Sequence, residues 1–344
     1  WQGLNAYLVG SRKSGNFWRL PLSRSFPPFP FPTSANQFVD NPQLLDAQWS
    51  WQLSASPSGV GRPWFVLVNF KLFCMANMTN TQQFCFKLVN LVLDTLALHT
   101  RGVSGGGRVD FVSKDKTGFN PRTRFDRIIE AGAFDMLQLI DPEAGFWGGE
   151  SGRLGAGKSM WMVDAVGGAK AFACGSKIWG TLLALTAGGY LRLGALDHPG
   201  LHERLIGIEG KTYWSQDGCD FRILKTATEA KQIRECVVAT SSYSLMDPLE
   251  RDAFAELADV ATYVIFDYDC YAYTLLAKGQ IDAVVDCQLQ PHEFVGLAPI
   301  LKGAGCVVSD WSGRDVCYSK RIIAARTAEI RDDIIELMTG APAE

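Results

Sequence analysis

The last third of the chain has the most regular pattern of hydrophobic and polar positions. Short apolar runs that predict strands alternate there with stretches in which apolar residues recur every three or four positions, as in helices. The predicted elements are, in order, strand 236–240, helix 248–259, strand 261–266, helix 270–278, strand 281–286, helix 293–302, strand 306–310 and helix 327–338. Asp247 followed by Pro248 marks the first helix, because aspartate favours the N-cap and proline the first helical position. This alternation predicts an α/β domain.

The pattern between residues 63 and 225 is less regular. Residues 63–99 are apolar enough for one or two helices, 109–112 predict a strand and 127–140 predict a helix. From 161 to 196, short apolar runs separated by glycines predict a meander of strands. This part of the chain therefore mixes helices with strands.

The beginning of the chain has a different composition. Residues 1–39 contain no acidic residue but several arginines and serines, and the proline-rich stretch 26–32 favours an extended conformation. We expect residues 1–62 to be an extension, either disordered or a targeting segment such as a plastid transit peptide. The length of 344 residues then leaves an N-terminal half at 63–225 and a C-terminal half at 226–344.

Composition excludes several classes of partner. Lysine and arginine number 33 against 36 acidic residues, a net charge of -3, and no basic block is long enough to bind nucleic acid. The apolar runs are too short and too polar to span a membrane. The nine cysteines are never closer than eleven positions, so no CxxC pair exists. This spacing favours a reducing compartment, and we expect a cytoplasmic protein unless residues 1–62 direct it to a plastid.

One stretch matches the phosphate-loop pattern GxxxxGK[ST], at Gly152–Ser159. A phosphate loop needs a buried strand before it and a helix after it, because the helix N-terminus holds the phosphates. A β-rich run, 160–164, follows instead. A hairpin turn is the better interpretation, and a nucleotide triphosphatase is disfavoured.

Two histidines stand four positions apart, as zinc ligands on a helix would. Pro199 and Gly200 lie between His198 and His202, however, and argue against a helix there. A metal role for this pair is not expected.

Three blocks in order carry a resemblance to a known family. Asn120–Arg127, Gly148–Gly152 and Trp161–Phe172 are similar to PxTxxDR, GEE and W(V/I)(L/I)DPIDGT(R/K)xF of the inositol monophosphatase superfamily. Asp269–Tyr273 (DCYAY) resembles the histidinol-phosphate phosphatase branch more narrowly. So do the blocks around Asp197–Pro199, Glu203–Arg204, Asp282–Val285, Leu289–Glu293 and Gly303–Gly305. The resemblance extends from about Phe111 to Met338.

The resemblance implies a fold and a reaction. The family fold is a layered αβαβα sandwich with an α+β N-terminal half and an α/β C-terminal half. The implied function is a Mg²⁺-dependent phosphomonoesterase acting on histidinol phosphate, in histidine biosynthesis, or on an inositol phosphate. The partner would be a small phosphorylated metabolite, and because family members are often dimers, a homodimer is implied by analogy.

The resemblance also assigns roles to residues. It makes Asp126 and Asp164 catalytic, with Asp126 acting on the attacking water. The implied Mg²⁺ ligands are carboxylates and one carbonyl, as hard cations prefer, supplied by Glu150, Asp164, Val166 and Glu293. The implied substrate contacts are the backbone N–H groups of Gly168 and Ala169 at the phosphate, Asp269 at the amine of histidinol phosphate, and Glu293.

Three positions depart from the family pattern. Gly149 replaces the first glutamate of GEE, Gly167 the second aspartate of DPIDGT, and Ala169 its threonine. Two metal-ligand carboxylates are therefore missing, and such losses commonly cost orders of magnitude in rate. The alternative is a catalytically impaired relative that binds a phosphorylated ligand or a partner protein.

Overall fold

The computed structural model describes residues 7–11, 17–21, 80–100, 111–113, 122–218, 220–226, 229, 231–316 and 319–340. The chain divides into two compact units, residues 1–46 and 47–344. In the first unit, β1 (Tyr7–Ser11) pairs antiparallel with β2 (Phe17–Pro21). The rest of the expected extension, 1–62, lies outside the described residues, and the domain limits at 62 and 225 stay a prediction.

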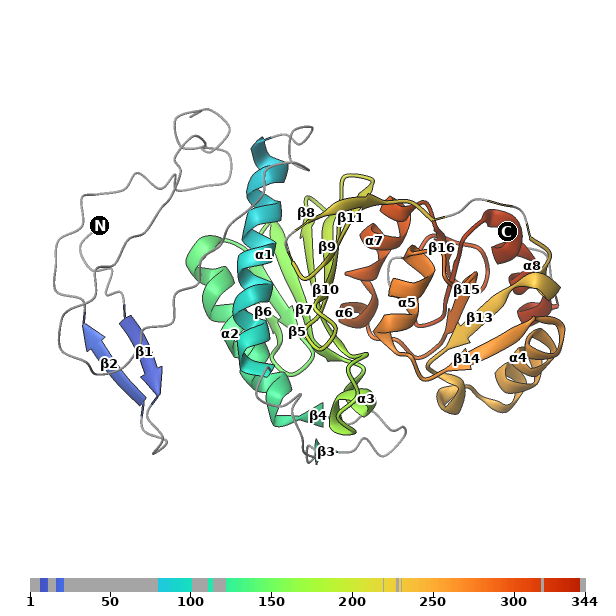
Figure 1. Ribbon diagram of the computed structural model, residues 1–344, viewed down its shortest axis with the longest axis horizontal. Coiled ribbons are helices and arrows are strands. Elements are labelled where there is room, and N and C mark those ends of the chain that lie inside the picture. The colour runs from blue at the N-terminus through green and yellow to red at the C-terminus, as the bar shows by residue number, and fades with distance from the viewer. Residues whose placement is uncertain are drawn as a thin grey trace. The chain divides into compact units, whose positions relative to one another are not determined.

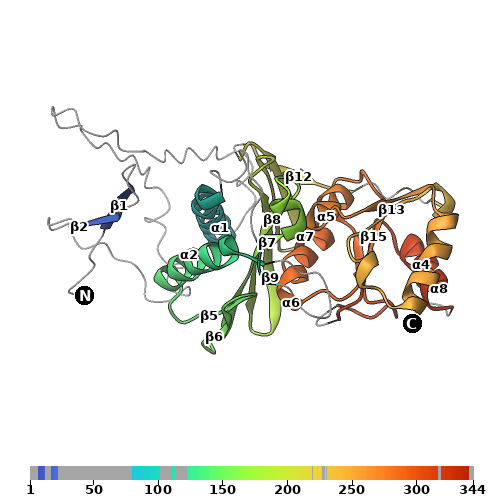
Figure 2. The ribbon, with the colours of Figure 1, turned by 90° about the horizontal axis from the view of Figure 1, so that it is seen from below.

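The second unit has five layers (Figure 1). Helices α1 (Asn80–Thr100) and α2 (Arg124–Ile140) cover one face of an eight-stranded sheet. Helices α5 (Cys270–Ala277), α6 (Pro291–Phe294) and α7 (Leu297–Ala304) lie on its other face (Figure 2). A five-stranded sheet follows, with α4 (Pro248–Val260) and α8 (Ala328–Thr339) on its outer face. The expected αβαβα sandwich is confirmed. None of the helices in the described part of the chain is long and apolar enough to cross a membrane.

The eight-stranded sheet carries most of the candidate site. Its strand order is β12-β11-β10-β9-β8-β7-β5-β6, and all neighbours are antiparallel except β5 and β7. The strands are β5 (Gly145–Gly148), β6 (Gly152–Leu154), β7 (Ser159–Gly167), β8 (Gly180–Ala187), β9 (Tyr190–His198), β10 (Glu203–Ile208), β11 (Lys211–Gln216) and β12 (Arg222–Leu224). A two-stranded ladder, β3 (Phe111–Ser113) with β4 (Arg122–Thr123), precedes α2.

The five-stranded sheet has the order β14-β13-β15-β17-β16. Its strands are β13 (Val237–Thr240), β14 (Tyr263–Phe266), β15 (Ala283–Asp286), β16 (Val307–Ser309) and β17 (Ile322–Ala325). Strands β13, β14 and β15 are parallel, and the chain crosses from one side of β13 to the other after β14. In parallel sheets, ligands bind at the carboxyl ends of strands next to such a crossover.

Alternation of side chains along these strands builds two cores. On β13, Val238 packs towards α4 and α8, whereas Ala239 packs towards the middle helices. Val284 on β15 likewise faces inward, with its neighbour Val285 facing outward. Because successive residues of a strand point to opposite faces, a strand covered on both sides is apolar at every position.

The predicted elements of the last third largely agree with the structure. The region predicted as one helix, 293–302, is two helices, α6 (Pro291–Phe294) and α7 (Leu297–Ala304). The predicted strand meander contains a short helix, α3 (Ala169–Ala173), and β17 was not predicted. Residues 63–79 and 109–110 lie outside the described residues.

Two paired glycines let α7 approach the eight-stranded sheet closely. Gly194 of β9 lies opposite Gly207 of β10. A Cβ on Gly194 would lie 2.0 Å from the Gly296 carbonyl oxygen, and one on Gly207 would lie 2.3 Å from the carbonyl carbon of Pro299. The sheet therefore contacts α7 backbone to backbone, a packing that only glycine permits.

A buried ionic network attaches α1 to the sheet. The Arg204 guanidinium donates to Asp197 at 2.8 Å, to Asp94 at 2.9 Å and to the Asn90 side-chain oxygen at 2.7 Å. Arg204 and Asp197 are each 5% exposed. Burial of these charges is tolerated because every partner is present, so the loss of one partner leaves a buried charge unpaired.

Replacing Arg204 tests this network. Arg204→Met should lower the free energy of unfolding by about 3–5 kcal/mol, because Asp197 would remain buried without its counter-ion. Urea denaturation followed by circular dichroism measures the change. The matched control is Lys302→Met, which breaks the exposed pair with Asp315 and should cost about 1 kcal/mol or less. Equal effects of the two substitutions would contradict the interpretation.

Candidate active site

Asp164 lies at an irregularity in β7. It pairs with Leu182 of β8, whereas Gly167 pairs with Gly180, so β7 contains one residue more than its partner over this interval. Such β-bulges redirect side chains and are frequent next to active sites. The Val166 N–H donates to the Asp164 carboxylate. The sequence block that resembles DPIDGT thus folds as a bulge followed by a tight turn into α3.

The charges of three further carboxylates affect the pKa of Asp164. Burial raises the pKa of Asp164 well above its ordinary value, and the charges of Glu293, Asp126 and Glu130 raise that pKa further. Asp126 comes from the first turn of α2 and Glu293 from α6. The structure therefore brings three predicted site residues, Asp126, Asp164 and Glu293, into one negatively charged cluster.

Glu130 is a member of this cluster that the sequence analysis missed. It follows Asp126 by four residues, so both lie on the same face of α2. Its carboxylate is 2% exposed and accepts hydrogen bonds from the backbone N–H groups of Glu150 and Ser151, each at 2.8 Å. The i, i+4 spacing from Asp126 was the signal that could have identified it. Glu130 orders the loop that carries the predicted ligand Glu150.

The Glu150 side chain forms an ion pair with the guanidinium of Arg127. Its Oε2 lies 3.3 Å from Nε of Arg127, which is itself largely exposed. Glu150 is not among the charges that raise the pKa of Asp164. Its role as a metal ligand stays a prediction.

The turn after Asp164 packs directly against Asp269. Gly168 has φ +88°, and a Cβ there would lie 3.2 Å from the Asp269 Cβ and 3.3 Å from the Trp179 Cα. The following residue, Ala169, begins α3. A side chain at Gly168 would be strained by the backbone and would find little space, so the turn at Gly168 packs closely against Asp269.

Asp269 has a strained backbone conformation, and the hydrogen-bonding capacity of its carboxylate is only partly used. It precedes α5 (Cys270–Ala277) with φ +47°, a conformation unusual for a residue with a side chain. Its Oδ2 is buried, and among the described residues no group forms a hydrogen bond with it. Burial raises the pKa of Asp269 to about 7, against the favourable charge of Lys170; the charges of Asp286, Asp267 and Glu293 add to the increase.

Neighbouring side chains occupy the space beside the two glycines, Gly149 and Gly167, that replace carboxylates of the family pattern. A Cβ on Gly149 would lie 2.9 Å from His292 Nε2. A Cβ on Gly167 would lie 2.9 Å from Leu182 Cδ1 and 3.0 Å from Asp164 Oδ2. The missing carboxylates have therefore not left open cavities.

His198 connects the phosphate turn to α5. Its Nδ1 lies 3.0 Å from the Trp179 carbonyl oxygen, and its Nε2 lies 2.8 Å from Thr274 Oγ1. His198 is fully buried, and burial lowers its pKa, which keeps the imidazole neutral. Both ring nitrogens therefore lie within hydrogen-bond distance of protein groups.

Glu203, next to His198 on the adjacent strand, fixes the two ends of α5. Its carboxylate accepts from Tyr271 at 3.2 Å, from Lys278 at 2.7 Å and from the Trp214 indole at 2.6 Å. The blocks that resemble the histidinol-phosphate phosphatase branch here are thus structural. They position α5 and, through it, Asp269.

The phosphate-loop pattern does not form a phosphate loop. Gly152–Leu154 is strand β6, and Ser159 begins strand β7, so a strand follows Lys158 where a helix is required. The predicted hairpin turn is wrong as well, because β6 and β7 do not pair: β5 lies between them in the sheet, and residues 155–158 connect two strands that are not neighbours.

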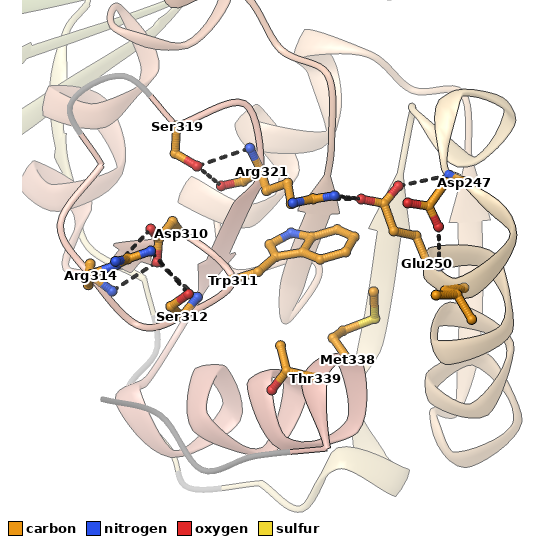
Figure 3. Close-up of a pocket in the computed structure, with 11 residues that line it drawn as sticks. Asp247, Glu250, Asp310, Trp311, Ser312, Arg314, Ser319, Arg321, Met338 and Thr339 are labelled. Atoms are coloured by element: carbon orange, nitrogen blue, oxygen red, sulfur yellow. Dashed lines mark hydrogen bonds and ion pairs between the residues drawn. The ribbon is translucent and has the colours of Figure 1, made fainter.

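A pocket outside the acidic cluster lies on the far side of the five-stranded sheet. It measures about 390 Å³ and is bounded by α4, α8 and the segment before β17 (Figure 3). The Arg321 guanidinium lies over the Trp311 ring and donates to Glu250 at 2.6 Å, and Arg314 pairs with Asp310. These charged groups are paired with one another, and none of them belongs to the cluster around Asp164.

Comparison with known proteins decides the family. The sequence profile described as "Inositol monophosphatase family" matches residues 85–341, three quarters of the chain. The chain belongs to the inositol monophosphatase family. That family consists of phosphoric monoester hydrolases, which agrees with the resemblance found in the sequence.

Several relatives in the family have assigned activities. The chain is 29% identical to the chloroplastic bifunctional phosphatase IMPL2 of Arabidopsis thaliana over 67% of this chain and 68% of that protein. It is 26% identical to a histidinol-phosphatase of Chlorobaculum parvum, over 67% of this chain and 87% of that one. An inositol monophosphatase structure from Zymomonas mobilis superposes with a TM-score of 0.65 at 25% identity, covering 74% of this chain and 98% of that one.

The family implies a divalent cation, and the donor set can be tested for it. Within the described ranges, no three side chains of His, Cys, Asp or Glu converge closely enough to form a complete metal site. Burial raises the pKa of Asp164 most, and the charges of Glu293, Asp126 and Glu130 raise it further. Hard divalent cations bind carboxylates and relieve such repulsion. The Glu293 carboxylate also accepts the Gln290 N–H at 2.6 Å, and Gly149 and Gly167 supply no side-chain ligand, so a cation at Asp164 and Glu293 stays a prediction.

The raised pKa of Asp269 makes stability depend on pH. An acid whose pKa is higher in the folded than in the unfolded protein stabilises the fold when protonated, so this stability is lost between the ordinary pKa, 3.8, and about 7. Relative to Asp269→Asn, the wild-type protein should lose about 1–3 kcal/mol between about pH 4 and about pH 8.

Urea denaturation of both proteins at the two pH values, with a chelator present, measures the difference. Asp315→Asn, at an exposed side chain, is the control and should follow the wild type. Parallel pH profiles of the wild type and Asp269→Asn would show that Asp269 titrates normally.

Proposed function

We propose that this chain is a divalent-cation-dependent phosphomonoesterase whose substrate is the phosphate ester of an amino alcohol, with histidinol phosphate as the leading candidate. The observation that carries the proposal is the position of Asp269. Its buried Oδ2, which accepts no hydrogen bond from the residues that the structure describes, lies against Gly168, in the turn that follows Asp164. A phosphate bound at that turn would place the rest of the ester next to Asp269.

Each residue of the proposed site has a role in hydrolysis of the phosphate ester. A cation held by Asp164, Glu293, the Val166 carbonyl and Glu150 would neutralise phosphate charge and acidify water. Asp126 orients the attacking water and accepts its proton. The backbone N–H groups of Gly168 and Ala169 donate to the phosphate oxygens, which fixes the phosphorus in front of the water.

Asp269 supplies selectivity for an ammonium group. A buried carboxylate oxygen that has no hydrogen-bond partner among the described residues, such as Asp269 Oδ2, is costly, and a cationic substrate removes that cost by pairing with it. A polyol phosphate such as an inositol phosphate offers hydroxyl groups, which pair less strongly with a carboxylate. The similarity to the histidinol-phosphatase from Chlorobaculum parvum supports this choice of substrate.

The proposal also covers the cellular location and the binding partners of the protein. We expect a cytoplasmic protein that acts on a small phosphorylated metabolite, does not bind nucleic acid or a membrane, and forms a homodimer. A plastid location is the alternative, supported by the acid-poor residues 1–39 and by the chloroplastic relative.

A second candidate function follows from the substituted glycines. With Gly149 and Gly167 in place of two carboxylates, the site could bind a phosphorylated ligand without hydrolysing it. Titration calorimetry with histidinol phosphate and a divalent cation separates the two candidates, because this one predicts binding with no release of phosphate.

Phosphate release is the direct test of the first candidate. The wild-type protein should release phosphate from histidinol phosphate in the presence of Mg²⁺ or Mn²⁺, and Asp164→Asn should reduce kcat by at least about a hundredfold, since it removes the central ligand of the cluster. Asp315→Asn should retain full activity. No release from histidinol phosphate or inositol phosphate with either cation would exclude the enzyme.

Asp269→Asn tests the substrate class. The variant should raise KM for histidinol phosphate by about tenfold or more, the value of one charge-assisted hydrogen bond, and leave kcat within about threefold. KM for inositol phosphate, which has no ammonium group, should change by less than about threefold. An equal rise in KM for both substrates would assign Asp269 a structural role instead.

A further inference from the structure

The turn proposed to hold the phosphate has no polar side chain of its own. Its residues are Gly167, Gly168 and Ala169, where the family pattern has an aspartate in the first position and a threonine in the last. Gly168 has φ +88°, in the left-handed region that glycine adopts without strain. The directions of the N–H groups in this turn therefore depend on contacts from neighbouring elements.

Two buried side chains from other elements donate to backbone carbonyls of this segment. Thr181 is the single residue of β8 opposite the bulge of β7, and its Oγ1 donates to the Ala165 carbonyl oxygen at 2.8 Å. At the start of α5, the Cys270 thiol donates to the Gly167 carbonyl oxygen at 3.2 Å. Both side chains are buried, so water does not compete strongly for these carbonyl groups.

The hydrogen bond from Cys270 also determines where the next N–H group points. A trans peptide is planar, and its C=O and N–H groups point in opposite directions. In the peptide that joins Gly167 to Gly168, the carbonyl oxygen is directed at the Cys270 sulfur. The Gly168 N–H, which the proposed function assigns to the phosphate, therefore points away from Cys270.

The surroundings of Cys270 keep this contact in place. Burial raises the pKa of Cys270 well above its ordinary value, and the charges of Asp269 and Asp164 raise it further, so the thiol keeps the proton that it donates. A Cβ on Gly167 would lie 3.4 Å from the Cys270 Cβ, and one on Gly168 would lie 3.2 Å from the Asp269 Cβ. Two successive residues, Asp269 and Cys270, thus contact two successive residues of the turn.

We propose that Cys270 is a positioning residue for the substrate phosphate: its thiol holds the Gly167 carbonyl and so directs the Gly168 N–H at the phosphate, while Thr181 holds the preceding bulge. The inference rests on the proposed function, since it assumes that phosphate binds at this turn. Every phosphate monoester carries the same phosphate group. Cys270 should therefore affect all substrates equally, whereas Asp269 should affect only those with an ammonium group.

Titration calorimetry with inorganic phosphate, in the presence of Mg²⁺, tests the inference. Cys270→Ala should weaken phosphate binding by at least about fivefold, and Cys270→Ser, which keeps a donor, should change it by less than about twofold. The matched control is Cys306→Ala, because Cys306 is buried in the same core but its thiol faces the Leu276 carbonyl oxygen. This control removes the same volume and should change phosphate affinity by less than about twofold.

Kinetics with two esters give a second measurement. Cys270→Ala should lower kcat/KM for histidinol phosphate and for inositol phosphate by the same factor, about fivefold or more, and Cys270→Ser should restore both values. Thermal unfolding should show similar losses of stability in Cys270→Ala and Cys306→Ala. A difference between these two variants in phosphate binding then does not come from unfolding.

The outcomes separate this inference from the proposed function. Equal phosphate affinity in Cys270→Ala and Cys306→Ala would overturn the role of Cys270. The same conclusion would follow if Cys270→Ser bound phosphate as weakly as Cys270→Ala, because side-chain volume rather than the donor would then be decisive. In both cases the wild-type protein would still bind and release phosphate. Failure of the wild-type protein to do either would remove the proposed function together with this inference.

Discussion

Two neighbouring pairs of buried polar residues on β9 and β10 hold the site together. Asp197 lies opposite Arg204, and His198 lies opposite Glu203. Successive residues of a strand point to opposite faces, so the first pair reaches α1 on one side of the sheet and the second reaches α5 on the other. Such groups are tolerated in the interior only when each has its partner. The positions of α1 and α5 relative to the sheet are thereby fixed.

This constraint extends to the reacting groups. His198 contacts the carbonyl of Trp179, and the Trp179 backbone lies beside Gly168 in the phosphate turn. His198 also contacts Thr274 in α5, the helix that begins directly after Asp269. The buried imidazole therefore links the segment beside the turn proposed to bind phosphate to the helix that follows the carboxylate proposed to bind the amine, in addition to the direct packing of Gly168 on Asp269. Rigid support of this kind is what a selective site requires.

The sequence predicted the parts of the molecule that depend on local pattern. The α/β arrangement after residue 236 follows from alternating runs and from the Asp247 N-cap, whose side chain accepts the Glu250 N–H as expected. Strand β17 was not predicted, because its four residues, 322–325, form only a short apolar run without a periodic pattern. The helix predicted at 293–302 is divided at Gly296, which lies against Leu182 of β8, a tertiary contact that no local pattern reveals.

The sequence also predicted the site residues that lie within the family blocks, but not those brought in by packing between distant segments. The family blocks contain Asp126, Asp164 and Glu293, and the structure brings the three together. Glu130 could have been inferred from its spacing to Asp126, but its bonds to the 150–151 backbone join segments twenty residues apart. The approach of His292 to Gly149 depends on how α6 packs on the sheet, so sequence spacing carries no information about it.

That approach changes how the substituted glycines should be understood. Protein interiors are close-packed, so removing a side chain leaves a cavity unless neighbours move in. Here His292 lies against the one glycine and Leu182 against the other. Restoring a carboxylate at Gly149 alone would therefore overpack the site, and the strain would oppose any gain from the added ligand. The two glycines and their neighbours therefore form a packed arrangement that leaves no room for the two carboxylates unless these neighbours move.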